Sequence, residues 1–431
     1  MSTLLIKNGR VIDPISKRDE IADVYIADGK IQSVGKSDIA SAEMVIDATG
    51  LVVSPGLVDI HVHFREPGRE DIETLETGSR AALAGGITSV VTMPNTAPIA
   101  DNQTGIEFII NRAKELNLID IFPAGSITKN EDGAILSEIR ELKNSGAVAV
   151  SDDGVDIDNT GVLLRALEYS KTHDMLLMNH CETPDLDNHG VMHEGWVSTD
   201  LGLPGIPEVA EDHAVTKAIM LAQRSGARLH LSHLSTKAAV AALREYKRTG
   251  AINVTGEVSV QNFALTDEAC RGYNTDAKMY PPLRSEDHVD ALIAAIKDGT
   301  IDAITTDHAP HIEPDKIKPF VDAARGTVGL ETSFAVLNTY LIKPGHVSLM
   351  DGLALMTYKP AAIIRKERGT LNIGADADIA IFDIAKEWVV DPSKFYSKGR
   401  NSVFAGKTLT GKALHTIYRG VIKMKDGIVL K

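Results

Sequence analysis

The sequence has few cysteines and no long apolar run. Its 431 residues include two cysteines, Cys181 and Cys270, which form neither a CxxC pair nor a disulfide framework. We therefore expect a reducing compartment, the cytoplasm. The chain has no apolar run of about 18 residues, and its first residues lack an apolar core and a cleavage site, so we expect neither a membrane span nor a signal peptide.

Basic residues are also fewer than acidic ones. The chain carries 45 lysines and arginines against 59 aspartates and glutamates, a formal net charge of -14. This balance argues against a nucleic acid or an anionic membrane as partner. It leaves the sign of the charge inside a pocket open, because a bound metal ion changes that locally.

The two ends of the chain are rich in short strand patterns. Turn signals such as Asp28-Gly29 and Asp426-Gly427 separate alternating apolar stretches. Neither end alone has enough strands to bury a core. We therefore predict that residues 1–55 and 366–431 together form a small β-sandwich domain.

Residues 56–365 alternate between apolar strand candidates and segments of helical period. Most of the strands are apolar throughout, as parallel strands buried on both faces are. Eight such repeats predict an α/β fold, a (β/α)8 TIM barrel, with its active site at the C-terminal ends of the strands. The predicted strands are 57–63, 88–93, 119–124, 147–153, 175–180, 228–233, 252–258 and 301–307.

Histidines and carboxylates gather at those strand ends. An isolated His-x-His is about as often a pair of solvated histidines as a pair of metal ligands. Five strand ends that carry such groups instead indicate one metal centre at the barrel mouth. Imidazole and carboxylate without thiolate suit Zn²⁺, with Mn²⁺ or Co²⁺ as substitutes, and six ligands suit two ions sharing a bridging carboxylate. The candidate ligands are His61, His63, Asp153, His180, His233 and Asp307.

Strand parity selects among neighbouring candidates, because alternate residues of a strand face the same side. Asp153 shares the inward face with Ala149, so we choose it over Asp152. His233 is chosen over His230 for the same reason. His193, in a loop-like stretch after the fifth strand, is expected to be solvated.

The motifs at these positions resemble the long-chain (type I) dihydroorotases of the amidohydrolase superfamily, and the resemblance covers essentially the whole chain. An HxH motif alone would indicate only the superfamily. The motifs that carry the resemblance lie at residues 61–68, 93–96, 151–154, 179–182, 232–236, 306–311 and 329–332.

This resemblance implies a role for each matching residue. His61, His63 and Asp307 would hold the more buried of two Zn²⁺ ions. His180 and His233 would hold the other, with Asp153 as the bridge. The substrate-binding residues it implies are Arg65, Asn95, His311, Tyr280, Val328 and Gly329, the first three for the substrate carboxylate.

The implied reaction is the reversible cyclisation of N-carbamoyl-L-aspartate to L-dihydroorotate in de novo pyrimidine synthesis. A metal-bridging hydroxide would attack the ring carbonyl in the opening direction, with Asp307 as the catalytic acid and base. The partners implied are a small anionic substrate, a second copy of the chain in a homodimer, and an aspartate carbamoyltransferase.

Two departures from the family pattern keep alternatives open. Residues 259–263 stand where relatives commonly carry Pro-His-His, and Tyr280 stands where they place an asparagine that contacts the substrate ring. The alternatives are another cyclic amidohydrolase, such as a hydantoinase or allantoinase, and a non-catalytic subunit supporting aspartate carbamoyltransferase. The carboxylate-binding set argues against a hydantoinase, and the retained ligands argue against a non-catalytic chain.

Overall fold

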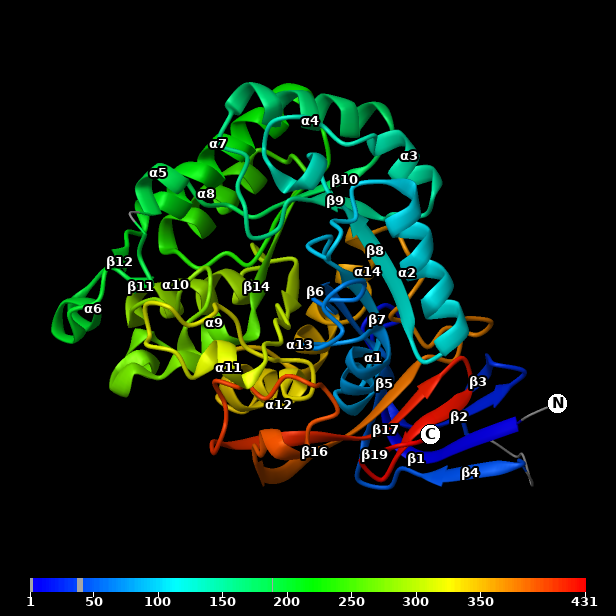
Figure 1. Cartoon of the computed structure of the whole chain (residues 1–431). Helices are drawn as coiled ribbons and strands as arrows, with labels where there is room; N and C mark the ends of the chain where they lie inside the picture. The colour runs from blue at the N-terminus through cyan, green and yellow to red at the C-terminus, as the bar shows by residue number, and fades with distance from the viewer. Residues whose placement is uncertain (1–2, 37–41, 188) are drawn as a thin grey trace.

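Eight parallel strands in the middle of the chain form a barrel (Figure 1). The structure is a computed structural model that describes residues 3–36, 42–187 and 189–431. Val62 and His308 bridge the first and last strands, and the amide of His63 donates to the carbonyl of His308 at 2.9 Å. The predicted TIM barrel is confirmed. Its strands are β6 (Leu57–Val62), β7 (Ile87–Thr92), β8 (Asp120–Gly125), β9 (Ala149–Ser151), β10 (Leu176–Asn179), β13 (Leu229–Leu231), β14 (Val254–Ser259) and β15 (Ala303–Thr305).

Helices surround the barrel, and several begin at a side chain that caps the first turn. Thr74, Asn102, Asn159 and Thr236 each accept a hydrogen bond from a backbone amide of the turn that follows. The longer helices are α1 (Leu75–Ala84), α2 (Gln103–Leu116), α4 (Thr160–Thr172), α7 (Val209–Ser225), α8 (Lys237–Arg248) and α10 (Glu286–Lys297). The shorter ones are α3 (Ile139–Asn144), α5 (Pro184–Asp187), α6 (Trp196–Leu201), α9 (Val260–Ala264), α11 (Glu313–Lys316), α12 (Ser333–Leu337), α13 (Leu349–Leu355) and α14 (Tyr358–Ile363).

The connection from β10 to β13 is the longest between two consecutive barrel strands. It contains α5, α6 and a small parallel pair, β11 (Met192–His193) and β12 (Gly205–Ile206). Figure 1 shows this segment projecting beyond the ring of helices. It supplies contacts to the barrel mouth that are described below.

The two ends of the chain pair in one nine-stranded sheet. Strand β5 is antiparallel to β16, which joins the N-terminal and C-terminal halves of the sheet (Figure 1). This pairing is consistent with the β-sandwich domain expected from the termini. Its strands are β1 (Thr3–Asp13), β2 (Arg18–Ala27), β3 (Lys30–Gly35), β4 (Met44–Asp47), β5 (Val52–Pro55), β16 (Ile379–Val389), β17 (Thr408–Tyr418), β18 (Val421–Lys425) and β19 (Ile428–Val429).

The terminal sheet packs against the barrel through buried aromatic and polar contacts. The rings of Phe334, on α12, and Phe382, on β16, stack with their centroids 3.9 Å apart. The hydroxyl of Thr416 donates to the carbonyl of Leu83, at the end of α1, at 2.7 Å. The sheet therefore supports the side of the barrel where α1 and α12 lie.

Across the described ranges, no helix is both long enough and apolar enough to cross a membrane.

Removing the Phe382 ring should loosen this packing. Phe382 is fully buried, so Phe382→Ala is expected to lower the free energy of unfolding by about 3–5 kcal/mol. Urea denaturation followed by circular dichroism measures the change. Phe108→Ala on α2 is the matched control, because that ring is 42% exposed. Equal destabilisation by the two substitutions would contradict the assigned contact.

Candidate metal centre

The six predicted ligands meet at the C-terminal end of the barrel, and all six are buried. His61 lies on β6, and the other five follow strand ends by one or two residues. The exposed fractions are 0% for His61, 4% for His63, 6% for Asp153, 3% for His180, 3% for His233 and 9% for Asp307.

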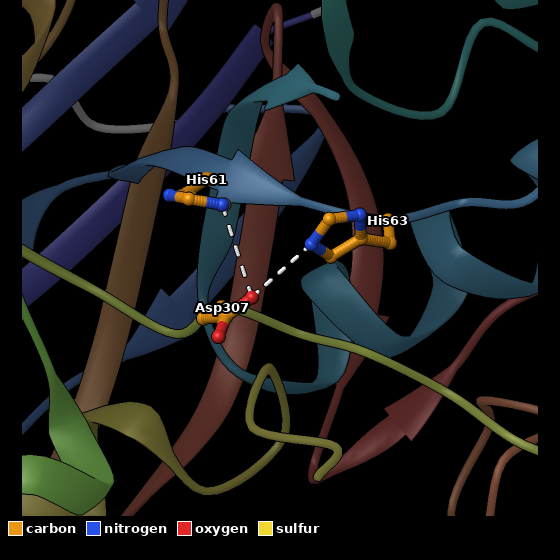
Figure 2. A group of neighbouring side chains, drawn as sticks. All are labelled: His61, His63 and Asp307. Atoms are coloured by element: carbon orange, nitrogen blue, oxygen red, sulfur yellow. Dashed lines mark hydrogen bonds and ion pairs between the residues drawn. The ribbon is translucent and has the colours of Figure 1, made fainter. Parts of the chain in front are cut away.

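Three side chains form the first group. The Nε2 atom of His63 lies 3.1 Å from Oδ1 of Asp307, and Nε2 of His61 lies 3.8 Å from the same oxygen. Figure 2 shows both imidazoles pointing toward the Asp307 carboxylate. One ligand atom from each residue lies within 4.8 Å of the others, which is close enough to hold one ion.

Asp153 lies among the four histidine ligands. Its carboxylate oxygens lie 3.1 Å from Nε2 of His61, 3.4 Å from Nε2 of His63, 3.8 Å from Nδ1 of His180 and 3.6 Å from Nε2 of His233. His61, Asp153 and His233 form a second group with ligand atoms within 4.8 Å. His180 joins it, since its Nδ1 lies 2.9 Å from Nε2 of His233. A carboxylate that touches both groups has the position of a bridging ligand.

Two buried atoms in this cluster test whether the residues fit a metal ion. Nε2 of His61 and Oδ1 of Asp153 lie 3.1 Å apart but are not aligned for a hydrogen bond, and neither has another hydrogen-bond partner among the described residues. Buried polar atoms almost always have one. Coordination to a cation would satisfy both. The nitrogen and oxygen donor set, without thiolate, fits a divalent transition metal.

Metal binding needs ionised carboxylates and neutral imidazoles. Burial lowers the pKa of His61, but the Asp153 and Glu257 carboxylates raise it well above its usual value, so this ring releases a proton when a cation binds. Burial favours the neutral acid at Asp153, but the surrounding imidazoles, His61 above all, hold the pKa of this carboxyl well below its usual value. Burial, with His233 beside it, lowers the pKa of His180 to about 3. Asp153 is therefore ionised and His180 neutral.

Glu257 is a site residue that the sequence analysis missed. Its side chain is fully buried on β14, and Oε1 accepts a hydrogen bond from Nδ1 of His61 at 2.6 Å. Oε2 lies 3.0 Å from Nε2 of His230, whose Nδ1 in turn lies 2.7 Å from the hydroxyl of Thr255. Glu257 thus fixes the ring of His61 with Nε2 toward the ligands. A lone glutamate inside an otherwise buried strand was the available signal.

Asn95 orients the second imidazole of the His-x-His motif. Its Oδ1 accepts a hydrogen bond from Nδ1 of His63 at 2.9 Å, which turns Nε2 of His63 toward Asp307. The amide nitrogen of Asn95 remains as a donor on a side chain that faces the mouth of the barrel.

Strained backbone accompanies the site. Arg65, His233 and Asp307 have φ angles of 60°, 33° and 47°, in the left-handed region that non-glycine residues rarely adopt. Such conformations cluster at functional sites, where the surrounding structure enforces them. All three residues are among those singled out from the sequence.

A cavity of about 250 Å³ opens onto the ligands. Of the predicted substrate-binding residues, Arg65, Asn95, Tyr280 and His311 line it. The complete lining is His63, Arg65, Asn95, Asp153, Gly154, His180, Tyr280, Asp307, Ala309, His311, Arg325 and Gly326.

Val328 and Gly329, also predicted to bind substrate, are not placed at this cavity. The amide of Val328 donates to the carbonyl of Asn401, and the amide of Gly329 donates to Nδ1 of His308. Both backbone amides are therefore occupied within the protein, and the role predicted for these two residues stays a prediction. Arg325 and Gly326, a few residues earlier, line the cavity instead.

Arg65 presents a guanidinium with an unused donor to the cavity. Its Nε is buried and has no hydrogen-bond partner in the described structure. Burial lowers the pKa of Arg65 to about 10, against the opposing effect of Asp307 and Asp153, so the group is charged at neutral pH. A partly buried cation with an unused donor is arranged for an anion that enters from outside.

His311 is already engaged in hydrogen bonding. Its Nε2–H donates to the carbonyl of Arg325 at 2.8 Å. Burial and the nearby charge of Arg65 lower the pKa of His311 to about 3, so the ring is neutral and its Nδ1 is an acceptor. It gains a second donor only on taking up a proton, which an approaching anion favours.

Two further expectations concern residues around the centre. His193 is 5% exposed and its Nδ1 lies 3.3 Å from Nη1 of Arg284, so the expectation that it is solvated was wrong. Packing of the β11–β12 excursion against the barrel, which no local pattern reveals, buries it. Residues 259–263 end β14 and form α9 without lining the cavity, so of the two departures only Tyr280 reaches it.

Comparison with known proteins identifies relatives of this chain. A family described as Dihydro-orotase-like matches residues 50–239, and the Amidohydrolase family matches residues 145–423. A protein of Ruminiclostridium cellulolyticum named dihydroorotase is 45% identical over 428 residues, which cover 99% of this chain and 100% of that protein. A dihydroorotase of Citrifermentans bemidjiense is 48% identical over 421 residues, 97% of this chain and 99% of that protein.

Among solved structures, an L-hydantoinase (dihydropyrimidinase) from Arthrobacter aurescens is similar to this chain with a TM-score of 0.88 and 26% identity. The match covers 100% of this chain and 98% of that one. A D-hydantoinase, 24% identical with a TM-score of 0.87, supports the fold alone. Both likenesses include the barrel and the terminal sheet together.

Glu257→Gln should weaken metal binding without unfolding the protein. The amide keeps the shape of the side chain but removes the charge that orients and polarises His61. We expect the affinity for Zn²⁺ to fall about 10- to 100-fold, measured by competition with a chromophoric chelator.

Glu245→Gln, at a side chain 75% exposed on α8, is the control and should bind Zn²⁺ as the unmodified chain does. Unchanged affinity in Glu257→Gln, with an unchanged melting temperature, would contradict the role given to Glu257.

Proposed function

This chain belongs to the dihydroorotase family of the amidohydrolases, and from that premise we propose that it is a long-chain dihydroorotase that interconverts N-carbamoyl-L-aspartate and L-dihydroorotate. Relatives carrying the name dihydroorotase are 44–48% identical to it over nearly its whole length. The cofactor we propose is Zn²⁺, two ions per chain. His61, His63 and Asp307 would hold one ion, His180 and His233 the other, with Asp153 between them.

The observation that carries this proposal is the guanidinium of Arg65 beside the ligand cluster, whose Nε has no hydrogen-bond partner among the described residues. Arg65 shares the cavity with His63, Asp153 and Asp307. A substrate that fills it should therefore carry a carboxylate close to its reacting bond, as both proposed substrates do. The hydantoin ring carries no carboxylate for Arg65 to bind. Arg65 therefore favours a dihydroorotase over a hydantoinase.

Two side chains supply donors for that carboxylate in the free protein. Arg65 can form a charge-assisted, bidentate pair with it. The amide nitrogen of Asn95 adds a directed hydrogen bond. His311 contributes as a donor when the bound negative charge raises its pKa enough to protonate Nδ1.

Asp307 is the residue placed to move the proton. When bound, the metal ions would supply a water of lowered pKa and polarise the ring carbonyl. Asp307 lines the cavity and takes the proton of the attacking water as that oxygen joins the carbonyl carbon. It then delivers the proton to the ring nitrogen as the carbon–nitrogen bond breaks, which leaves the new carboxylate and the ureido group.

Asp307→Asn tests the proton-transfer role. The amide keeps the size of the side chain but cannot accept the proton, so we expect at least a 1,000-fold loss of kcat, on the order of the contribution of general acid–base catalysis. Turnover is measured by the absorbance of dihydroorotate, with bound metal and melting temperature recorded on the same sample.

The matched control is Asp298→Asn, at an exposed carboxylate at the end of α10, which should keep full activity. Near-normal turnover in Asp307→Asn would refute the role of Asp307.

Arg65→Met should separate binding of the carboxylate from chemistry. Losing a buried charge-assisted pair is expected to lower kcat/KM for dihydroorotate about 100-fold, mainly through KM. Activity on an uncharged ring such as dihydrouracil should not fall, because that ring makes no pair with Arg65. Steady-state kinetics on both rings measures the difference, and an equal loss on both would count against a carboxylate site at Arg65.

A further inference from the structure

The cavity contains a second guanidinium, that of Arg325, which the proposed mechanism does not use. Its central carbon lies 4.1 Å from the centroid of the Tyr280 ring. The Tyr280 ring in turn lies 4.9 Å from the ring of His180, at an interplanar angle of 32°. His180, Tyr280 and Arg325 therefore form a stack that leads from a predicted metal ligand to the cavity wall.

Contacts on several sides hold Arg325 in this position. Its Nη2 donates to the carbonyl of Gly190 at 2.9 Å, from the excursion after β10. Its own carbonyl accepts the Nε2–H of His311 at 2.8 Å. Asp187 lies 3.8 Å from Nη2, an ion-pair distance beyond hydrogen bonding. Glu182 is a second carboxylate that interacts with the charge of Arg325. Among the described residues neither carboxylate hydrogen-bonds to the guanidinium, and the side chain is 34% exposed, so it can bind another acceptor.

The two guanidiniums act on different parts of the site. Both guanidiniums line the cavity, but it is that of Arg325 that packs on Tyr280 and so approaches His180. His311 lies between them, close to the charge of Arg65 and bonded to the backbone of Arg325. The cavity therefore has a second cationic group, beside Tyr280, in addition to Arg65.

The proposed substrate has three polar regions to place. Its carboxylate is matched by Arg65 and Asn95, and its reacting amide carbonyl is matched by the ligand cluster. The ureido carbonyl, between two N–H groups, remains. A planar guanidinium is a strong donor to such an oxygen, and an aromatic ring can pack against the face of the substrate ring.

We propose that Arg325, positioned by the ring of Tyr280, is a specificity-determining residue that donates hydrogen bonds to the ureido oxygen of the substrate. The inference rests on the proposed dihydroorotase function. It assigns the contact with the substrate ring to Arg325 and Tyr280 together. The sequence motifs singled out Tyr280 but not Arg325.

The test compares Arg325→Met with the unmodified chain on dihydroorotate and on its 2-thio analogue. Sulfur is a weaker acceptor than oxygen, so the analogue isolates this contact. For dihydroorotate we expect kcat/KM to fall about 10- to 100-fold, mostly through KM, the size of one hydrogen bond to a charged group. For the thio analogue we expect a change of less than about 3-fold.

Tyr280 variants test the positioning role. Tyr280→Phe keeps the ring under Arg325 and should retain most of the discrimination between oxygen and sulfur. Tyr280→Ala removes the support and should reproduce the loss seen in Arg325→Met. The double variant should lose little more than either single variant, because both act through one contact.

Arg224→Met, at an exposed arginine on α7, is the control and should leave both kcat/KM values unchanged. Melting temperature and bound zinc are measured for every variant. An equal loss on both substrates in Arg325→Met, or no loss on either, overturns the inference while leaving the proposed function in place. Failure of the unmodified zinc-loaded chain to hydrolyse dihydroorotate overturns the proposed function and the inference together.

Discussion

The Asp153 carboxylate, buried among four imidazoles, is the interaction on which the rest of this structure depends. An ionised carboxylate in the centre of a protein is unfavourable unless opposite charge or metal surrounds it. Here the surrounding groups come from the ends of strands β6, β10 and β13, so satisfying one carboxylate requires distant parts of the chain to meet. The unpartnered oxygen of Asp153 and the unpartnered nitrogen of His61 leave room for a cation to complete the arrangement. The same cluster forms the candidate metal site.

The barrel and this site reinforce each other. The bridge from Val62 to His308 joins the first strand to the last, and its residues adjoin the ligands His61, His63 and Asp307. Closing the barrel therefore also brings the two halves of the first ligand group together. Behind the ligands, Glu257 and Asn95 fix the rings of His61 and His63. Arg65 and Arg325 line the cavity beside the cluster, where their two positive charges offset those of Asp153 and Asp307 within a chain whose net charge is -14.

Local patterns in the sequence predicted the parts of this structure that depend on local rules. Apolar runs located eight barrel strands to within a few residues, and strand parity distinguished Asp153 from Asp152 and His233 from His230. Residues whose role depends on long-range contacts escaped prediction. Glu257 acts on His61 from a strand almost 200 positions away, and the stacking of Arg325 on Tyr280 follows no periodicity. The burial of His193 likewise depends on how an excursion folds back onto the barrel, which neither strand parity nor motif spacing describes.

The central claim is that six side chains form a two-metal centre whose cavity accepts a carboxylated cyclic ureide. Titrating metal-free protein with Zn²⁺ while following dihydroorotate hydrolysis tests this claim most directly. The account predicts that turnover appears with added zinc and levels off near two equivalents per chain. Protein that binds less than one equivalent, or that binds zinc and leaves dihydroorotate intact, would contradict it.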